Sequence, residues 1–517
     1  MSVPAADSRS PWLAAIAGVV AVGGALGASE LVAGLIAGAP SLVLSVGGAV
    51  IDLQPPGAKD FAVALFGTND KLALEVAVVV ASLAIGAVLG VLALRWPAVA
   101  SAAFVGFAAL GFVAAFRDPT VSPAMAAVVA GVAAVVGTQL LQRLLGVLAS
   151  SRARDAQADA SMPDWRRRSF LLRSAGLAVG AVVAGAAGRT FLERQRQSPS
   201  QATDQLPLPG EVVSLPPGAE LPVSGLTPLV VPNNEFYRID TALIVPSVDL
   251  ASWRLRIHGL VERDTTLTFG ALVDLGTIEQ YVTIACVSNE VGGDLVGNAK
   301  WTGVRLRDVL GLAGVRPGAT QLVGRAVDGW TAGMPTAWVM DESREPLIAV
   351  QMNDEPLPLA HGFPARLIVP GLFGYVSATK WLTELELTTW EAFDAYWVPL
   401  GWAKEGPILT QSRIDVPANR AGVSAGRTTI AGVAWAPDRG ISAVEVSIDG
   451  TWRAAILSRP ISDATWIQWR LDWDATAGEH TLAVRATDGR GDVQTDRRSP
   501  PAPDGARGHH TIRVTVG

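Results

Sequence analysis

Cys286 is the only cysteine among the 517 residues, and it stands where a thiol can do chemistry. It follows a short run of β-type residues, Tyr281–Ile284, and precedes a glycine-rich stretch that ends at Asp294. A thiol at the end of a strand that opens into a loop can project toward a bound group. The alternative is a buried, inert cysteine that packs as a small hydrophobe, the commoner fate of a single cysteine. It has no partner for an intrachain disulfide.

Two further motifs follow in order: His361-Gly362-Phe363-Pro364-Ala365-Arg366, and then Lys380-Trp381-Leu382. Together with the cysteine stretch, they resemble the HGxPxR and KW signatures of the molybdenum-cofactor domain of the sulfite oxidase family. In that family a strand-end cysteine gives its thiolate to molybdenum. The resemblance covers roughly residues 205–517, and it implies an oxidoreductase with an α+β domain that binds molybdenum–molybdopterin.

The resemblance also implies a role for each matching position. Cys286 would be the metal ligand, since a thiolate is a soft donor suited to a redox transition metal. Arg238 matches an arginine that faces the metal. The other expected cofactor-binding residues are Asn234, His361, Arg366 and Lys380. Of these, His361 and Arg366 match positions that hold the pterin phosphate, and an arginine suits this role because its planar fork pairs with two oxygens at once.

Two departures concern the substrate. The family follows its cysteine with a Gly-Asn-Arg run, whereas Glu290 falls about where that arginine stands. The substrate-side tyrosine corresponds to Trp330, which joins Cys286 and Arg238 as an expected catalytic residue. An anionic substrate needs convergent cations, so these changes weaken the case for sulfite. Three functions stay open: sulfite-oxidase-like oxygen-atom transfer, reduction of S-oxides or N-oxides, and a non-catalytic scaffold on a degenerate cofactor fold.

The first part of the chain predicts a membrane anchor. A helix needs ~20 apolar residues to cross the hydrocarbon core. Five stretches qualify, at 12–37, 73–94, 97–116, 123–149 and 170–189. A soluble all-α core is the alternative, which five successive apolar runs make improbable. The apolar piece 40–51 is too short to span, so it is expected to be re-entrant or interfacial.

The arginines and lysines predict the orientation of these spans. They concentrate on the side of the N-terminus, which places it in the cytoplasm and the chain after about residue 190 outside a bacterial-type plasma membrane. Arg167 and Arg168 directly precede the fifth span. They resemble a twin-arginine export signal, and a plain positive-inside flank explains them equally well. Glu30 and Glu75 are candidates for function within the membrane, or for interfacial and capping roles.

The expected organisation is a membrane domain at 1–195, a molybdopterin domain at 196–405 and a C-terminal domain at 406–517. Residues Gln195 to Gly225 are rich in Gln, Ser, Pro and Gly and predict a linker. Short strands with turns predict an immunoglobulin-like β-sandwich at the C-terminus, with a hairpin at Asp449-Gly450. The family resemblance implies a homodimer through this domain.

The sequence predicts that electrons are exchanged with a separate protein. All five histidines come at or after His258, so a bis-histidine haem among the apolar stretches is excluded, and no cysteine cluster for iron–sulfur is present. We therefore expect molybdenum to be the only redox metal here and a separate cytochrome or quinone-linked partner to exchange electrons with it. The net charge of −6 gives no reason to expect nucleic acid as a partner.

Overall fold

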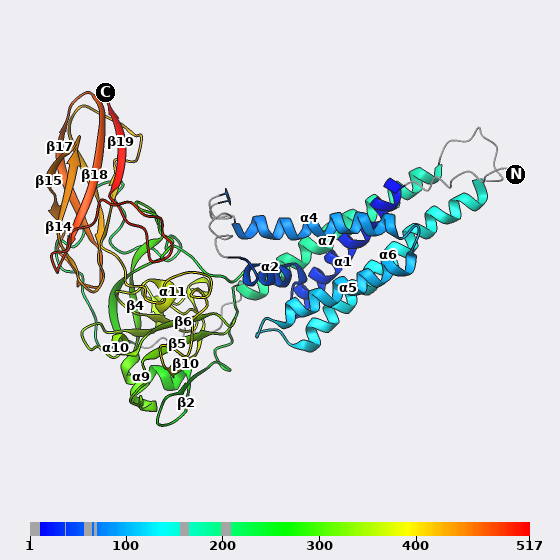
Figure 1. The fold of residues 1–517 in the computed structure, drawn as a ribbon, viewed down its shortest axis with the longest axis horizontal. Helices are drawn as coiled ribbons and strands as arrows, with labels where there is room; N and C mark the ends of the chain where they lie inside the picture. The colour runs from blue at the N-terminus through cyan, green and yellow to red at the C-terminus, as the bar shows by residue number, and fades with distance from the viewer. Residues whose placement is uncertain are drawn as a thin grey trace. The chain divides into compact units, whose positions relative to one another are not determined.

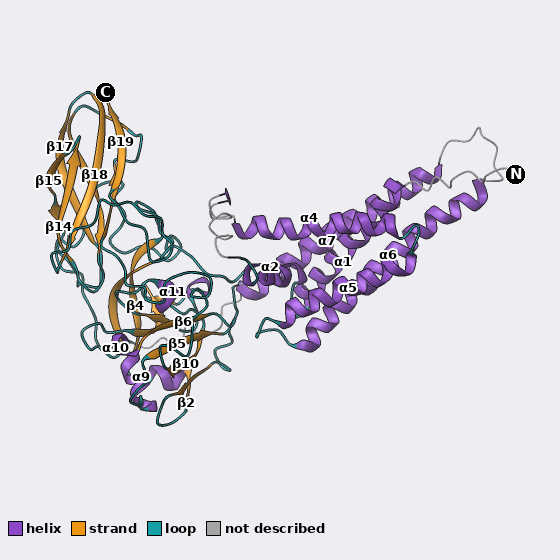
Figure 2. Ribbon diagram, viewed as in Figure 1, coloured by secondary structure: helices purple, strands orange, loops and turns teal. Residues whose placement is uncertain are grey.

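The computed structural model describes residues 11–36, 38–55, 65–66, 70–155, 165–197, 208–243 and 245–517. It divides into two compact units, which are described separately. The first unit comprises Met1–Pro199 with Thr241–Val245, and the second comprises Ser200–Asp240 with Pro246–Gly517. Figures 1 and 2 show that the first is helical and that the second is built mainly from strands.

The described helices of the first unit are α1 (Pro11–Leu35), α2 (Leu42–Asp52), α4 (Asp70–Leu92), α5 (Pro97–Phe116), α6 (Pro123–Asp155) and α7 (Trp165–Gln197). All except α2 are long and apolar enough to cross a membrane, which confirms the five predicted long apolar helices; that they span a membrane stays a prediction. The short piece 40–51 forms α2, whose N-terminus is capped by the Ser41 side chain.

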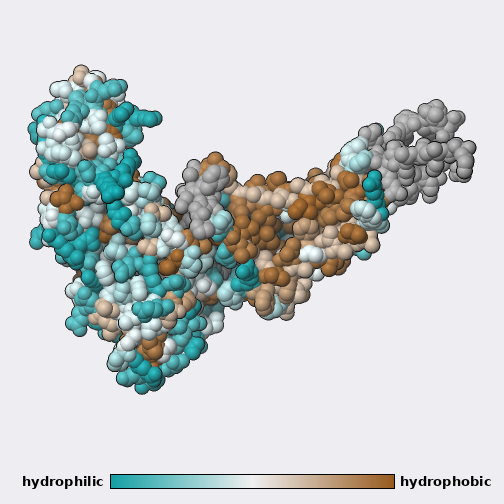
Figure 3. All heavy atoms as spheres, viewed as in Figure 1, coloured by the Kyte–Doolittle hydropathy of each residue, from teal (hydrophilic) through white to brown (hydrophobic). Residues whose placement is uncertain are grey.

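The surfaces of these helices are apolar both where they touch and where they face outward. An added Cβ at Gly34 on α1 would lie only 2.2 Å from the carbonyl oxygen of Gly188 on α7, so these two helices approach closely at small residues. Figure 3 shows hydrophobic colour over much of the helical unit, and Val80 and Val182 are among its exposed side chains. An apolar exterior of this kind suits contact with lipid.

Charged side chains in this unit have partners near the helix ends. The Ser41 hydroxyl donates to Glu30 near the end of α1 at 2.7 Å. Arg189 near the end of α7 donates through Nη2 to both carboxylate oxygens of Glu75 near the start of α4, at 3.1 and 3.0 Å. The roles of Glu30 and Glu75 stay predictions.

The second unit begins with an α+β part that holds two sheets. The first sheet has the order β2-β1-β10-β5-β6 and the second β3-β4-β7-β8, with β9 paired to β7. Their bounds are β1 (Arg254–Gly259), β2 (Thr265–Thr268), β3 (Ile278–Ala285), β4 (Val296–Arg305), β5 (Gln321–Ala326), β6 (Thr331–Pro335), β7 (Leu347–Met352), β8 (Glu355–Pro356), β9 (Arg366–Ile368) and β10 (Leu382–Thr388). The helices of this part are α8 (Phe269–Val273), α9 (Leu306–Ala313), α10 (Thr336–Val339), η3 (Leu359–His361) and α11 (Gly374–Ser377).

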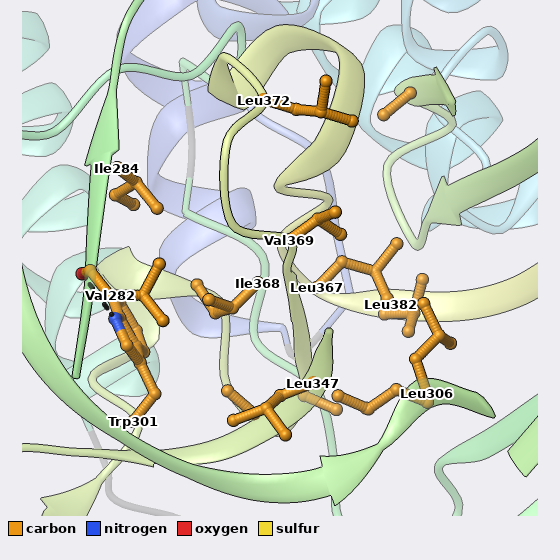
Figure 4. Packing of buried hydrophobic residues seen from close by; sticks show 14 of the residues in the cluster. Val282, Ile284, Trp301, Leu306, Leu347, Leu367, Ile368, Val369, Leu372 and Leu382 are labelled. Carbon is orange, nitrogen blue, oxygen red and sulfur yellow. Dashed lines mark hydrogen bonds between the residues drawn. The ribbon is translucent and has the colours of Figure 1, made fainter. Parts of the chain in front are cut away.

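A hydrophobic core holds β3 and β9 in place. Figure 4 shows Val282 and Ile284 of β3 in one cluster with Leu367 and Ile368 of β9. Trp301 of β4 is fully buried beside them, and its indole N–H donates to the carbonyl of Val282 at 3.3 Å. Cys286 directly follows β3, and Arg366 begins β9. A packed core therefore fixes the positions of both residues.

Two further sheets form the C-terminal β-domain, defined here as residues 411–516. Their orders are β11-β13-β17-β16 and β12-β19-β18-β14-β15. The bounds are β11 (Gln411–Val416), β12 (Gly422–Val423), β13 (Gly426–Trp435), β14 (Ile441–Ile448), β15 (Thr451–Ala454), β16 (Ile456–Leu457), β17 (Ile467–Ala475), β18 (Gly478–Asp488) and β19 (His510–Val516). The predicted hairpin is confirmed, because Asp449 and Gly450 join β14 to β15 with positive φ angles of 50° and 88°.

Part of the predicted linker segment is packed into the second unit. Residues 198–207 lie outside the described residues, but from Gly210 onward the chain is bound to the second unit. The N–H of Gly210 donates to the Thr277 carbonyl at 2.8 Å, and the N–H of Glu279 on β3 donates to the Glu211 carbonyl at 2.9 Å. Polar composition predicted freedom here, whereas the backbone hydrogen bonds tie this segment to a strand edge.

Candidate active site

Cys286 follows β3 and opens a short closed loop before β4. Its N–H donates to the Leu295 carbonyl at 2.9 Å, and its carbonyl accepts from the N–H of Asn289 at 3.1 Å. The buried Asn289 side chain in turn accepts from the N–H of Leu295 at 2.9 Å. The thiol is half-buried and lies 2.9 Å from the Ser288 hydroxyl. The predicted strand-end geometry of the thiol is therefore present, on a loop that hydrogen bonds hold in shape.

His361 and Arg366 form a buried pair on the other motif. The Arg366 side chain is 3% exposed, and its Nη1 donates to the His361 carbonyl at 3.0 Å. Its guanidinium also lies over the Trp301 ring, 5.0 Å from the ring centroid. Burial lowers the pKa of Arg366 to about 10. Among the described residues, the Nε of Arg366 has no hydrogen-bond partner and no carboxylate forms an ion pair with it.

His361 is held as a neutral ring. Burial, followed by the neighbouring Arg366 and Lys380 charges, lowers its pKa to about 4. Its Nε2 lies 3.0 Å from the carbonyl oxygen of Asn233, which can only accept, so Nε2 carries the proton. The next residue, Gly362, has φ of 114°, and an added Cβ there would lie 3.0 Å from Lys380. Glycine at this position lets the two motifs come together.

Lys380 and Arg238 share one carboxylate. The Asp240 Oδ2 atom accepts from Lys380 Nζ at 3.0 Å and from Arg238 Nε at 2.9 Å. Lys380 is 9% exposed, and burial lowers its pKa to about 8, while Asp240 acts in the opposite direction. We refer to Arg238, Arg366 and Lys380 as the basic cluster. It carries more positive charge than its one carboxylate can match.

Tyr237 lies within electrostatic range of both Cys286 and Arg366. Burial is the main cause that raises its pKa; the Cys286 thiolate adds to this rise and the Arg366 guanidinium opposes it. Its ring stacks on Phe236 at 5.3 Å between centroids, and Phe236 meets the His361 ring edge-on at 5.7 Å. His361 thus contacts this aromatic pair directly, and Arg366 lies over Trp301, which Phe236 also meets edge-on.

The structure does not connect every expected site residue to this group. Trp330 is half-buried in the turn between β5 and β6, and Asn234 is exposed. Among the residues that the structure describes, no hydrogen bond or ring contact ties either of them to the basic cluster. The exposed Glu290 lies in the Cys286 loop. The roles expected for Trp330 and Asn234 stay predictions.

Three residues of the site were missed by sequence reasoning. They are Asn233, which holds His361, with Tyr237 and Asp240. All three lie in the same run, 233–240, as Asn234 and Arg238. A carboxylate two residues after a functional arginine was the available signal, because side chains two apart in an extended segment point to the same face.

Comparison with known proteins shows which proteins this part of the chain is similar to. Residues 242–397 match the family described as oxidoreductase molybdopterin binding domain. The mitochondrial sulfite oxidase of Homo sapiens is 30% identical over 334 residues, covering 55% of this chain and 61% of that protein. Residues 242–397 are thus similar to molybdopterin-binding oxidoreductase domains, and the chain is similar to sulfite oxidases.

Other relatives extend this result. Nitrate reductase [NADH] 1 of Oryza sativa subsp. japonica is 27% identical over 318 residues, covering 49% of this chain and 34% of that protein. The crystal structure of the sulfane dehydrogenase SoxCD from Paracoccus pantotrophus shares the fold, with a TM-score of 0.50 and 24% identity over 62% of this chain and 92% of that one. Residues 411–484 match a bacterial Ig domain, which confirms the immunoglobulin-like prediction. The chain spans less than two thirds of the human and rice proteins.

The molybdopterin-binding domain has residues that fit its cofactor. A buried cation is costly unless an anion compensates it, and Arg366 is buried with its Nε unpaired among the described residues. A phosphate supplies several acceptor oxygens for such a guanidinium. Arg366 and Lys380 would therefore hold the anionic part of the cofactor, and Cys286 offers a soft thiolate ligand to the metal.

The twin-arginine prediction falls on the first turns of α7. The backbone of this run is helical, but the side chain of Arg167 lies outside the described residues. Whether the run is an export signal or a positive flank stays a prediction.

Proposed function

We propose that this chain is a membrane-anchored oxidoreductase that transfers an oxygen atom between its substrate and water, outside the cytoplasm. Its anchor would be residues 1–195, its molybdopterin domain would lie within 196–405, and the Ig-like domain within 406–517 could pair two copies. The observation that supports the proposal is that Arg366 is buried with its Nε unpaired among the described residues and lies over the Trp301 ring. The Trp301 indole N–H donates to Val282 of β3, the strand that ends directly before Cys286. The proposal takes Cys286 as the metal ligand and Arg366 as the anion-binding cation of one site.

The residues divide the work as follows. When bound, molybdenum–molybdopterin supplies two-electron oxygen-atom transfer. Cys286 would hold the metal, while Arg366 and Lys380 would orient the cofactor through its phosphate. Arg238 would face the substrate, with Trp330 and Asn234 completing the expected contacts. The packed Phe236–Tyr237 pair would keep water from the thiol side of the site.

The first candidate substrate is sulfite, by similarity to the human relative. Sulfite and water would give sulfate, two protons and two electrons. The electrons would leave to a separate cytochrome or quinone-linked partner, because this chain is expected to contribute no haem or iron–sulfur cluster.

The ion pair at Asp240 favours a second candidate, reduction of an S-oxide or N-oxide. In this reaction the oxide, two protons and two electrons give the reduced compound and water. Asp240 binds both Arg238 and Lys380, so a carboxylate offsets one of the two positive charges beside the expected substrate position. A neutral oxide needs no free cation, whereas sulfite does.

Replacing the thiol tests the proposal. We expect Cys286→Ser to abolish turnover with artificial electron dyes in the purified full-length protein, because an alcohol is a poor ligand for a redox transition metal. Molybdenum content and turnover are measured together. The control is Ser288→Ala, which removes the hydroxyl 2.9 Å from the thiol and keeps the sulfur. Wild-type turnover in the serine variant, or wild-type protein without molybdenum, would refute the assignment.

Asp240→Asn separates the two substrate classes. The change keeps the side-chain shape and removes the negative charge beside Arg238 and Lys380. If the carboxylate excludes anions, KM for sulfite should fall by about tenfold, the scale of one charge-assisted contact, while KM for a neutral S-oxide changes much less. Asp264→Asn, in an exposed ion pair with Arg256, is the matched control. An equal change for both substrates would remove the argument for the reductase.

A further inference from the structure

The strand before Cys286 is an edge strand, and the C-terminal β-domain covers the part of its outer edge nearest the cysteine. In its sheet, β3 is the edge strand, with β4 on one side only. On the other side, the N–H of Thr283 donates to the Ala464 carbonyl at 2.9 Å, and the N–H of Trp466 donates to the Thr283 hydroxyl at 2.7 Å. Thr283 and Trp466 are fully buried. The β-domain thus holds the strand three residues before the thiol.

The loop after Cys286 is held by the same domain. Arg413 of β11 donates through Nη1 to the carbonyl of Gly293 at 2.7 Å. Its direction is fixed, because Nε donates to Asp415 at 2.6 Å and Nη2 to Thr227 at 2.9 Å. Arg413 as a whole residue is only 8% exposed, so water does not compete for the hydrogen bonds of its guanidinium.

A second contact on this loop is steric. Gly292 has φ of 82°, and an added Cβ there would lie 2.3 Å from the His510 ring. His510 is itself held in place, because its Nδ1 accepts from the N–H of Ile414 at 3.0 Å. The loop therefore rests against a ring that cannot easily turn away.

The loop transmits these contacts to the thiol. Hydrogen bonds from Cys286 to Leu295, and from Leu295 to Asn289, close it into one unit. A displacement at Gly292 or Gly293 consequently moves Cys286 rather than being absorbed by slack chain. We propose that the C-terminal β-domain positions the Cys286 thiol, with Arg413, His510 and Trp466 as positioning residues. The inference rests on the proposed function only in taking this thiol as the metal ligand.

The single cysteine makes a direct test possible, since iodoacetamide labels one thiol in the full-length chain. In cofactor-free protein, well below the thermal midpoint of each variant, we expect Gly292→Ala and Arg413→Lys to change the labelling rate of Cys286 by about tenfold, the scale of one lost charge-assisted hydrogen bond. Lys keeps the charge of Arg413 but not its three-way fork.

Two matched controls separate positioning from general damage. Gly318→Ala imposes a similar backbone strain at φ of 91° with nothing near the new Cβ, and Arg485→Lys makes the same exchange in an ion pair with Glu445 of the β-domain. Both should label like wild type. Adding His510→Ala to Gly292→Ala removes the clash, so the double variant should label at the rate of His510→Ala alone.

In cofactor-loaded protein, the two test variants should lower kcat more than they raise KM, and should shift the spectrum of the molybdenum–thiolate centre. Unchanged labelling in both variants, or equal changes in the controls, overturns the inference. Labelling needs no metal, so its outcome is independent of whether the chain proves to bind molybdenum.

Discussion

Arg366 is a buried cation that the chain itself matches only in part. Its side chain has one hydrogen bond to a carbonyl, a ring beneath it and an Nε without a partner among the described residues. Buried charges of this kind reduce stability unless an anion is bound. The arginine is therefore best explained by binding, since an apolar side chain of similar size would suit the folded chain alone.

Arg366→Met should therefore have opposite effects on the stability of the protein and on its binding of the cofactor. The thermal midpoint of cofactor-free protein should stay the same or rise, because a buried charge is replaced by an apolar chain of similar length. Retention of the cofactor should fall by more than about tenfold, the scale of a lost bidentate phosphate contact. The measurements are thermal unfolding and molybdenum content after purification.

Arg307→Met is the control for Arg366→Met. Arg307 pairs with Glu345 at the surface of the same domain, away from the basic cluster. It should leave the molybdenum content as in wild type. A marked loss of stability in cofactor-free Arg366→Met would show that Arg366 is a structural residue instead.

At the scale of elements, the site depends on where β3 and β9 begin and end. Cys286 directly follows β3, and Arg366 begins β9 after the turn at Gly362. That turn carries φ of 114° and passes against the main chain of Lys380. The turn, rather than either motif alone, sets the spacing between Arg366 and Lys380.

Gly362→Ala should accordingly separate the two cations. Backbone strain of about 1–3 kcal/mol and a Cβ 3.0 Å from Lys380 both oppose the native turn. We expect a lower thermal midpoint and loss of cofactor. Gly276→Ala, at φ of 93° with open space around it, carries strain without the contact. If both variants retain cofactor equally, the close approach at Gly362 does not matter for binding.

The sequence predicted the elements better than their partners. Local patterns were enough for five apolar helices, for the strand before Cys286 and for the Asp449-Gly450 hairpin, because each is set by nearby residues. The ion pair of Asp240 with Lys380 and the contact of Thr283 with Trp466 join positions far apart in the chain, so no local pattern indicates them. The polar composition of this region predicted a linker, but the chain at Gly210 is hydrogen-bonded to an edge strand.

At the scale of the whole molecule, polar contacts constrain which helix ends share a side of the membrane. Glu75 near the start of α4 pairs with Arg189 near the end of α7 at 3.0 Å. If each long helix crosses once, the four crossings from α4 to α7 return the chain to the side where α4 began. The pairing therefore agrees with five spans and an N-terminus opposite to the catalytic domain.

The orientation itself follows from the arginine and lysine bias, and reporter fusions test it. A reporter that works only outside the cytoplasm should be active after Gly517 and after Asp118, between α5 and α6. It should be inactive after Arg95, between α4 and α5. Activity after Arg95 together with silence after Gly517 would reverse the orientation and place the molybdenum site in the cytoplasm.

The export route is a separate question, because Arg167 and Arg168 can serve as a signal or merely as charge. Replacing both with lysine keeps the positive flank, so a topological role predicts unchanged export. A twin-arginine signal requires the arginines themselves, so export of the catalytic domain should fall sharply. We expect the fall, since a domain that takes up a large cofactor in the cytoplasm must cross the membrane folded. Protease accessibility of the domain in spheroplasts gives the exported fraction, and full export of the lysine variant would leave the charge as the only role of this pair.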